Sequence, residues 1–116
     1  MSKALAEKIV GVLDDKKAMD IVMLGVAELT IVADYFVIAT ATSTTHIRAL
    51  CEEIEHQLEK DGITPGHIEG KATGWVLLDY GAVVVHLFLP DARKTYNLER
   101  LWDDCAVEDI SRLLSE

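Results

Sequence analysis

Hydrophobic residues near the start of the chain recur at the three- and four-residue spacing of a helix. Ser2, a favourable N-cap residue, stands just before them. The apolar positions are Leu5, Ile9, Val12 and Leu13, with the charged residues Glu7, Lys8, Asp15 and Lys16 around them. This pattern predicts an amphipathic helix over residues 2–18.

Two runs rich in β-branched and aromatic residues follow, at residues 20–25 and 31–39. A polar stretch around Glu28 and Thr30 separates them. Runs of this composition are typical of strands. We therefore expect two strands here, paired antiparallel.

The segment 43–62 has the clearest helical pattern in the chain. Ser43 is placed to cap its start, and Gly62 follows its end. One apolar stripe is formed by Ile47, Leu50, Cys51, Ile54 and Leu58, and the opposite face is acidic. A second amphipathic helix is predicted.

The second half of the chain predicts three more strands. A short one at residues 67–69 lies among turn residues, and two apolar ones follow, joined at Tyr80-Gly81-Ala82 and ended by Pro90. The tail predicts a short helix or turn near residues 98–102 and a last helix carrying Val107, Ile110, Leu113 and Leu114. This order predicts one α/β domain over residues 1–116, a mixed sheet of about five strands flanked by helices.

Charge changes the picture of possible partners. The chain has 11 Lys and Arg against 20 Asp and Glu, a net charge of −9. Binding to nucleic acid by neutralising phosphates is disfavoured, and a basic protein partner is favoured. No apolar run is long enough to cross a membrane, and the N-terminal segment has no signal cleavage site. We expect a cytoplasmic protein with no membrane contact.

Catalytic and metal-binding patterns are weak. Cys51 and Cys105 belong to no CxxC pair, and both are expected to be free thiols. The carboxylates of Asp34, Glu69 and Asp79 have no partner that the sequence places nearby, so structural or binding roles are favoured. His67 and Glu69 would point to the same side of a strand, but two ligands do not make a metal site. No metal or cofactor is expected.

Two other histidines have plain structural interpretations. His86, within an apolar run, is expected to be a buried neutral imidazole bonded to a backbone or carboxylate group. His46 lies near the start of the second predicted helix, where capping and anion binding both fit. The adjacent run 39–43 lacks the glycines of a phosphate-binding loop.

Aromatic residues late in the chain suggest a protein interface. Trp75 follows Gly74 directly, and Tyr96, Leu98 and Trp102 come after Arg93. Tryptophan and tyrosine commonly anchor interfaces, and surrounding acids select a basic partner. For Trp102, packing in the core is an equally good interpretation.

Four strings, ADYFVIATATSTTHI, IEG, GWVLLDYGAVVVHLF and ARKTYNLERLW, resemble the Iojap family of ribosomal silencing factors, in order and spacing from residue 4 to 104. The resemblance implies a nucleotidyltransferase-like fold without established catalysis. It implies docking on a basic large-subunit ribosomal protein, number fourteen of that subunit, which blocks joining of the small subunit and lowers translation when nutrients are scarce. The partner-binding residues it implies are Trp75 above all, then Glu69, Gly70, Leu77, Asp79, Tyr96, Leu98 and Glu99.

Other functions stay open at this point. A nucleotidyltransferase-like enzyme would need a Gly-Ser loop and paired carboxylates, where the chain has ATATS and Asp79 alone. An assembly factor for the large subunit would use the same docking surface as a silencing factor. The same apolar and aromatic surface would also allow a homodimer of the free protein.

Overall fold

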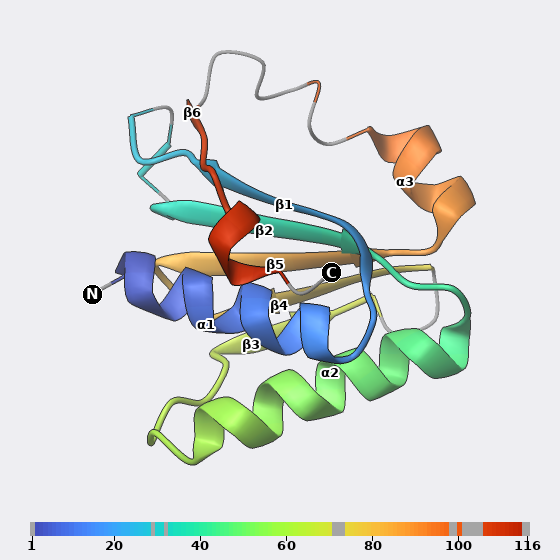
Figure 1. The fold of residues 1–116 in the computed structure, drawn as a ribbon, viewed down its shortest axis with the longest axis horizontal. Coiled ribbons are helices and arrows are strands. Elements are labelled where there is room, and N and C mark those ends of the chain that lie inside the picture. The colour runs from blue at the N-terminus through green and yellow to red at the C-terminus, as the bar shows by residue number, and fades with distance from the viewer. Residues whose placement is uncertain are drawn as a thin grey trace.

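A six-stranded sheet with the order β3-β4-β5-β2-β1-β6 forms the centre of the molecule (Figure 1). The structure is a computed structural model that describes residues 2–28, 30–31, 33–70, 74–97, 100 and 106–114. Its elements are α1 (Ser2–Asp15), β1 (Met19–Gly25), β2 (Tyr35–Thr40), α2 (Thr44–Glu59), β3 (His67–Glu69), β4 (Trp75–Asp79), β5 (Val83–Phe88), α3 (Pro90–Tyr96), β6 (Ala106–Val107) and a 3-10 turn at Ser111–Leu113. The mixed α/β fold is as predicted, with one strand more than expected.

The helices α1 and α2 cover one face of the sheet (Figure 1). The apolar stripe of α2 is buried at every predicted position, from Ile47 to Leu58. Ser43 caps α2 as predicted, because its side-chain oxygen accepts a hydrogen bond from the His46 backbone amide at 3.1 Å. Both helices therefore pack as their sequence patterns require.

Strand pairing makes the sheet mixed. The pair β1 and β2 is antiparallel, as predicted, and β4 and β5 form the predicted hairpin. The Tyr80 amide donates to the Val83 carbonyl at 2.9 Å, with Gly81 at a φ of 83° between them. The β2–β5 pair is parallel, which the long connection through α2, β3 and β4 allows.

Some predicted boundaries were wrong. The first helix ends at Asp15 instead of residue 18, because Lys17 adopts a left-handed φ of 64°. Strand β2 starts at Tyr35 instead of residue 31. Ile31 is apolar but fully exposed, so it belongs to the connection before the strand.

The C-terminal third departs most from prediction. Pro90 ends β5 but also begins α3, a helix that was not expected there. The predicted last helix is instead the strand β6, in which Val107 is 72% exposed, and the short 3-10 turn. The helix or turn expected near residues 98–102 lies outside the described residues, apart from Arg100.

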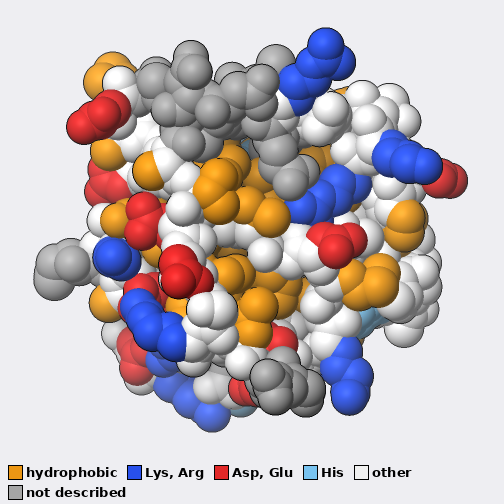
Figure 2. All heavy atoms as spheres, turned by 45° about the horizontal axis from the view of Figure 1, so that its top comes forward, with side chains coloured by type: hydrophobic (Ala, Val, Ile, Leu, Met, Phe, Trp, Pro, Cys, Tyr) orange, Lys and Arg blue, Asp and Glu red, His pale blue; other side chains and the backbone are white. Residues whose placement is uncertain are grey.

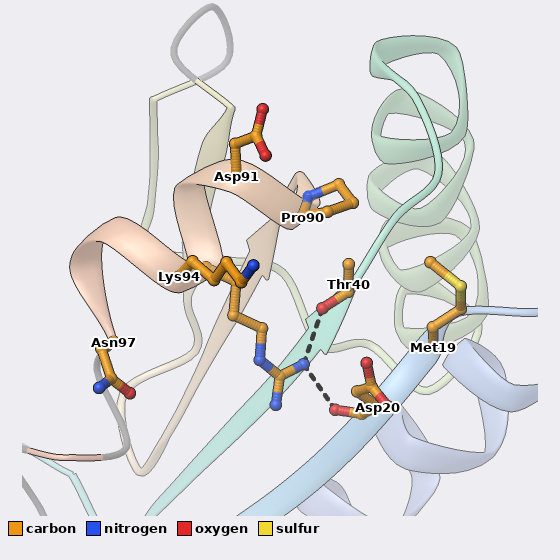
Figure 3. A pocket seen from close by; sticks show the side chains of 8 residues that line it. Met19, Asp20, Thr40, Pro90, Asp91, Lys94 and Asn97 are labelled. Atoms are coloured by element: carbon orange, nitrogen blue, oxygen red, sulfur yellow. Dashed lines mark hydrogen bonds between the residues drawn. The ribbon is translucent and has the colours of Figure 1, made fainter.

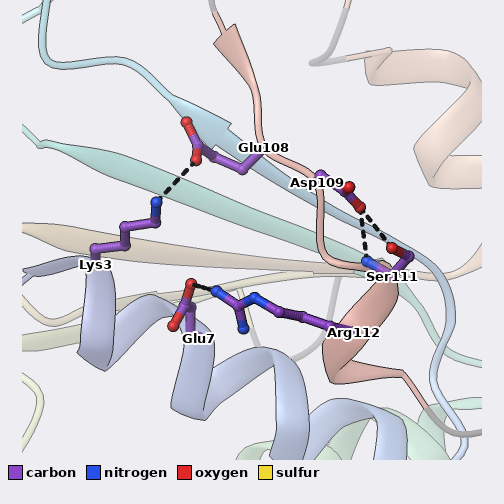
Figure 4. A network of polar contacts seen from close by, with 6 residues as sticks. All are labelled: Lys3, Glu7, Glu108, Asp109, Ser111 and Arg112. Carbon is purple, nitrogen blue, oxygen red and sulfur yellow. Dashed lines mark hydrogen bonds and ion pairs between the residues drawn. The ribbon is translucent and has the colours of Figure 1, made fainter.

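Polar contacts tie the C-terminal segment to α1 (Figure 4). Lys3 pairs with Glu108 at 3.6 Å, and Arg112 pairs with Glu7. Asp109 accepts hydrogen bonds from the backbone amide and hydroxyl of Ser111, which lower the pKa of its carboxyl group. The Lys3–Glu108 and Arg112–Glu7 ion pairs lie at the surface, where such pairs contribute about 0–1 kcal/mol each.

Candidate partner-binding site

The side chains of β4 alternate between the two faces of the sheet. Val76 and Leu78 are buried beneath the helices, whereas Trp75, Leu77 and Asp79 are half-buried on the opposite face. Strand β3 pairs with β4 so that Glu69 lies opposite Leu77. Since directly paired residues point to the same face, the predicted residues of β3 and β4 share one surface.

A hollow of about 160 Å³ lies on this surface, lined by Glu69, Gly70, Trp75 and Leu77. Four residues predicted for partner binding are therefore brought together. The floor is aromatic and aliphatic, and Glu69 supplies one carboxylate at its edge. Glu69 is well exposed and lies 2.5 Å from the His67 imidazole (Nε2 to Oε1). We refer to Glu69, Gly70, Trp75 and Leu77 as the Trp75 surface.

Aromatic rings support Trp75 from the side of the protein. Its ring is nearly parallel to that of Phe88, with centroids 5.2 Å apart, and lies 4.6 Å from that of Tyr96 on α3. Tyr96 itself is 48% exposed. Trp75 therefore combines packing against the sheet with access to the hollow.

His86 on β5 is the polar neighbour of this aromatic cluster. The indole Nε1–H of Trp75 donates a hydrogen bond to His86 Nδ1 at 3.2 Å. Burial lowers the pKa of His86 to about 4, so the imidazole is neutral at pH 7. The predicted buried neutral histidine is thus correct, but its partner is an indole instead of a backbone or carboxylate group.

Of the other predicted site residues, some are described by the structure and some are not. Asp79 Oδ1 accepts a hydrogen bond from the Gly81 amide at 2.8 Å, which gives it a role in the hairpin turn. Leu98, Glu99, Trp102 and Cys105 lie outside the described residues. Burial raises the pKa of Tyr80, beside Asp79, to about 12.

A second hollow, of about 480 Å³, lies where α3 meets the ends of β1 and β2 (Figure 3). Arg93 Nη1 donates hydrogen bonds to the Asp20 carbonyl at 2.6 Å and to Thr40 Oγ1 at 2.8 Å. Asp20 has a left-handed φ of 50° at the irregular part of β1. Arg93, which belongs to the string ARKTYNLERLW, thus joins α3 to the sheet.

His46 is also structural. Its Nδ1 accepts from the Thr42 amide at 2.9 Å, so its Nε2–H donates to the Lys16 carbonyl at 2.8 Å. Both ring nitrogens are therefore engaged in holding the start of α2 to the end of α1. The alternative of anion binding by this side chain is not supported.

The residues that the structure describes, 2–28, 30–31, 33–70, 74–97, 100 and 106–114, contain neither a metal-ligand cluster nor a membrane-spanning helix. Within that part of the chain, no three His, Cys, Asp or Glu side chains are grouped to hold a metal ion. No described helix is long and apolar enough to cross a membrane. The side chain of Cys51 is buried.

The face of the molecule shown in Figure 2 mixes apolar and charged groups. With the top of Figure 1 turned toward the viewer, hydrophobic side chains gather in the middle of the molecule, with acidic and basic groups around them (Figure 2). Such a mixture is typical of partner-binding surfaces, in which an apolar centre has a polar rim.

Sequence reasoning did not identify the contact between Trp75 and His86. A signal for it was present, because the two-residue turn at Gly81-Ala82 fixes the hairpin register. That register places Leu77 opposite His86 and Trp75 opposite Phe88. Trp75 and His86 are then diagonal neighbours on one face.

Known proteins resemble the chain over most of its length. A family model described as "Ribosomal silencing factor during starvation" matches residues 1–116. The ribosomal silencing factor RsfS of Bacillus subtilis is 43% identical over 98 residues, 84% of this chain and 83% of that protein. The mouse protein named mitochondrial assembly of ribosomal large subunit protein 1 is 37% identical over 100 residues, 83% of this chain and 44% of that protein.

A solved structure agrees with these matches. The crystal structure of a protein from Chromobacterium violaceum has a TM-score of 0.85 and 32% identity, and covers 89% of this chain and 87% of that one. The relative from Bacillus subtilis is named as a silencing factor, not as an enzyme. The match of the family model to the whole chain, with relatives of this similarity, shows that the chain belongs to the family of ribosomal silencing factors.

Proposed function

We propose that the chain docks through its Trp75 surface on a basic protein of the large ribosomal subunit, number fourteen of that subunit, and thereby blocks joining of the small subunit. Family membership supports a role at the ribosome during starvation. The observation that best supports docking through this surface is the hollow in which Glu69, Gly70, Trp75 and Leu77 come together. Repression of translation follows from occupying a surface that the small subunit needs.

Charge supports this choice of partner. The net charge of −9 speeds the approach to a basic protein and repels the phosphates of surrounding ribosomal RNA. Glu69 places one of these negative charges beside the apolar floor of the hollow. Direct contact with nucleic acid is therefore expected to be small.

The proposed mechanism is steric and needs no chemical step. Trp75 supplies a large anchor whose inner side already packs on Phe88 and Tyr96. Little side-chain entropy is then lost on docking, because the ring is held before the partner arrives. Leu77 extends the apolar contact beside it.

Co-sedimentation with separated ribosomal subunits tests this function. The protein should travel with isolated large subunits and not with small subunits or joined ribosomes. A matched pair of charge reversals sharpens the test: Glu69→Lys should weaken recovery, whereas Glu59→Lys, on the exposed part of α2, should leave it unchanged. Equal recovery with both subunits would show nonspecific attachment.

A second candidate function is assembly of the large subunit, favoured by the name of the mouse relative. The two functions use the same docking surface but act at different times. Cells lacking the protein should have normal large subunits if it only silences, and should accumulate immature large subunits if it assists assembly. Sedimentation profiles of growing and starved cells distinguish the two.

Pairing of the free protein with a second copy stays a prediction. The apolar part of the Trp75 surface is available for such pairing in the absence of the ribosome. Sedimentation equilibrium of the isolated chain, with Trp75→Ala as the comparison, tests whether this surface forms a homodimer.

A further inference from the structure

His86 occupies the middle of the sheet on the face that carries Trp75. It pairs with Leu77 on β4 and with Ile38 on β2, and its side chain is buried, with 4% exposed. The Phe36 ring contacts the imidazole edge-on, with the ring centroids 4.8 Å apart. An apolar residue would suit these surroundings better than an imidazole does, because burying a polar ring is costly unless it is hydrogen-bonded.

The hydrogen bond from Trp75 determines the state of this imidazole. An indole N–H can only donate, so Nδ1 of His86 must be unprotonated to accept it. The neutral ring then carries its proton on Nε2. This Nε2 is buried without a hydrogen-bond partner among the described residues.

Among the described residues, only one ring nitrogen of His86, Nδ1, therefore has a hydrogen-bond partner. Unlike leucine or phenylalanine, the imidazole offers a hydrogen-bond acceptor at Nδ1. The Trp75 indole N–H donates to this acceptor. Stacking on Phe88 and contact with Tyr96 restrict the plane of the indole. Neither contact distinguishes the two ring orientations related by a flip, whereas a directional hydrogen bond does.

We propose that His86 is a positioning residue for the Trp75 surface: as the neutral Nε2–H tautomer, it holds the indole in the one orientation that the partner meets. This role rests on the docking function proposed above. His86 itself stays buried and acts only through Trp75. Among the described residues its Nε2–H has no partner, and the cost of burying it is offset by an anchor ordered before binding.

The tautomer is tested first, on the unaltered chain. Long-range nitrogen–proton NMR of labelled protein at pH 7 should show His86 protonated on Nε2 and unprotonated on Nδ1. A ring protonated on Nδ1, or on both nitrogens, overturns the proposal. This measurement needs neither a variant nor a ribosome.

The role in docking is tested with a matched pair of substitutions. Asparagine and leucine have nearly the same shape, but only His86→Asn places an oxygen acceptor near the former Nδ1. His86→Leu should shift the indole N–H signal of Trp75, which is assigned by its loss in Trp75→Phe. It should also weaken binding to large subunits about fivefold, the scale of one hydrogen bond. His86→Asn should restore the signal and keep the affinity within about twofold.

The possible outcomes separate the two proposals. Unchanged binding by His86→Leu overturns the positioning role and leaves docking intact. Equal loss by both variants with an unshifted indole signal shows a merely structural role, and also overturns it. Failure of the unaltered chain to bind large subunits overturns the docking function, and with it this role of His86. If His86→Leu does not fold, the positioning role is decided by the tautomer of His86 and by the variant His86→Asn. Weakened binding by His86→Asn would then contradict the role.

Discussion

The two faces of the sheet are built from different kinds of residue. Beneath α1 and α2 the buried side chains are almost all aliphatic, from Ile9 and Leu13 to Leu50 and Leu87. The opposite face also buries aliphatic residues, such as Leu24 and Ile38, but it adds the rings of Phe36, Phe88 and Trp75, with His86 among them. Aliphatic packing maximises burial, whereas aromatic rings with polar atoms also fix orientation. The first face therefore provides stability, and the second is suited to recognition.

Adjacent leucines on β4 give the sharpest test of this contrast, and the largest expected effect. Leu78 is fully buried beneath the helices, and Leu77 is half-buried at the hollow. Leu78→Ala should lower the free energy of unfolding by about 3 kcal/mol, because it leaves a cavity in a packed core. Leu77→Ala should lower it by about 1 kcal/mol or less and instead weaken docking.

Urea unfolding and subunit co-sedimentation measure the two effects separately. Large subunits should bind Leu78→Ala normally wherever it remains folded. The division between a stabilising face and a recognition face would be wrong if the two alanine variants lost stability equally and neither lost binding.

The pH dependence of stability distinguishes the faces next. The pKa of His86 is about 4 in the folded protein and about 6.5 in the unfolded chain. The unfolded chain therefore binds more protons between these values, so stability is fully present above pH 6.5 and falls as the pH drops toward 4. The expected loss is about 3 kcal/mol.

His86→Leu supplies the control for this titration. The difference in unfolding free energy between the unaltered chain and the variant should shift by this amount between pH 7 and pH 4. Subtracting the variant also removes the acid titration of carboxylates such as Glu53 and Asp109, whose pKa values are lowered by hydrogen bonds. Parallel curves for the two proteins would contradict a buried neutral His86.

Sequence alone predicted the aliphatic face better than the aromatic one. The stripe of α2 and its Ser43 cap follow from helical periodicity, which records a single local contact pattern. On the other face, the orientation of Trp75 depends on Phe88, Tyr96 and His86, which come from β5 and α3. Periodicity along one strand does not contain such side-chain geometry.

The errors of prediction have similar causes. Pro90 fits both the end of a strand and the first turn of a helix, and only the following residues' packing decides that α3 starts there. Val107 and Ile110 matched a helical spacing, but β1 offers an edge to which residues 106–107 pair instead. In the site, the resemblance predicts Glu69, Gly70, Trp75 and Leu77 as partner-binding residues, whereas their meeting at one hollow and the contact with His86 depend on the strand register.

Trp75→Ala should weaken binding to large subunits by about 2 kcal/mol, roughly thirtyfold, if the indole is the anchor of the interface. Some stability is also lost, because the ring packs on Phe88 and Tyr96. Trp75→Phe keeps part of this packing and should have an intermediate affinity. Circular dichroism checks that each variant is folded, and binding equal to that of the unaltered chain would show that Trp75 belongs only to the core.

The smallest effect is expected at the start of α2, on the stabilising side. Ser43 accepts a hydrogen bond from the His46 amide, so Ser43→Ala should lower the free energy of unfolding by about 1 kcal/mol. Thr45→Ala, at an exposed position in the first turn, is the matched control and should cost nothing, because alanine is the better helix former. Neither variant should change co-sedimentation with large subunits. Weaker docking by the folded Ser43→Ala chain would mean that the start of α2 takes part in recognition, and the aromatic face would then not be the whole docking surface.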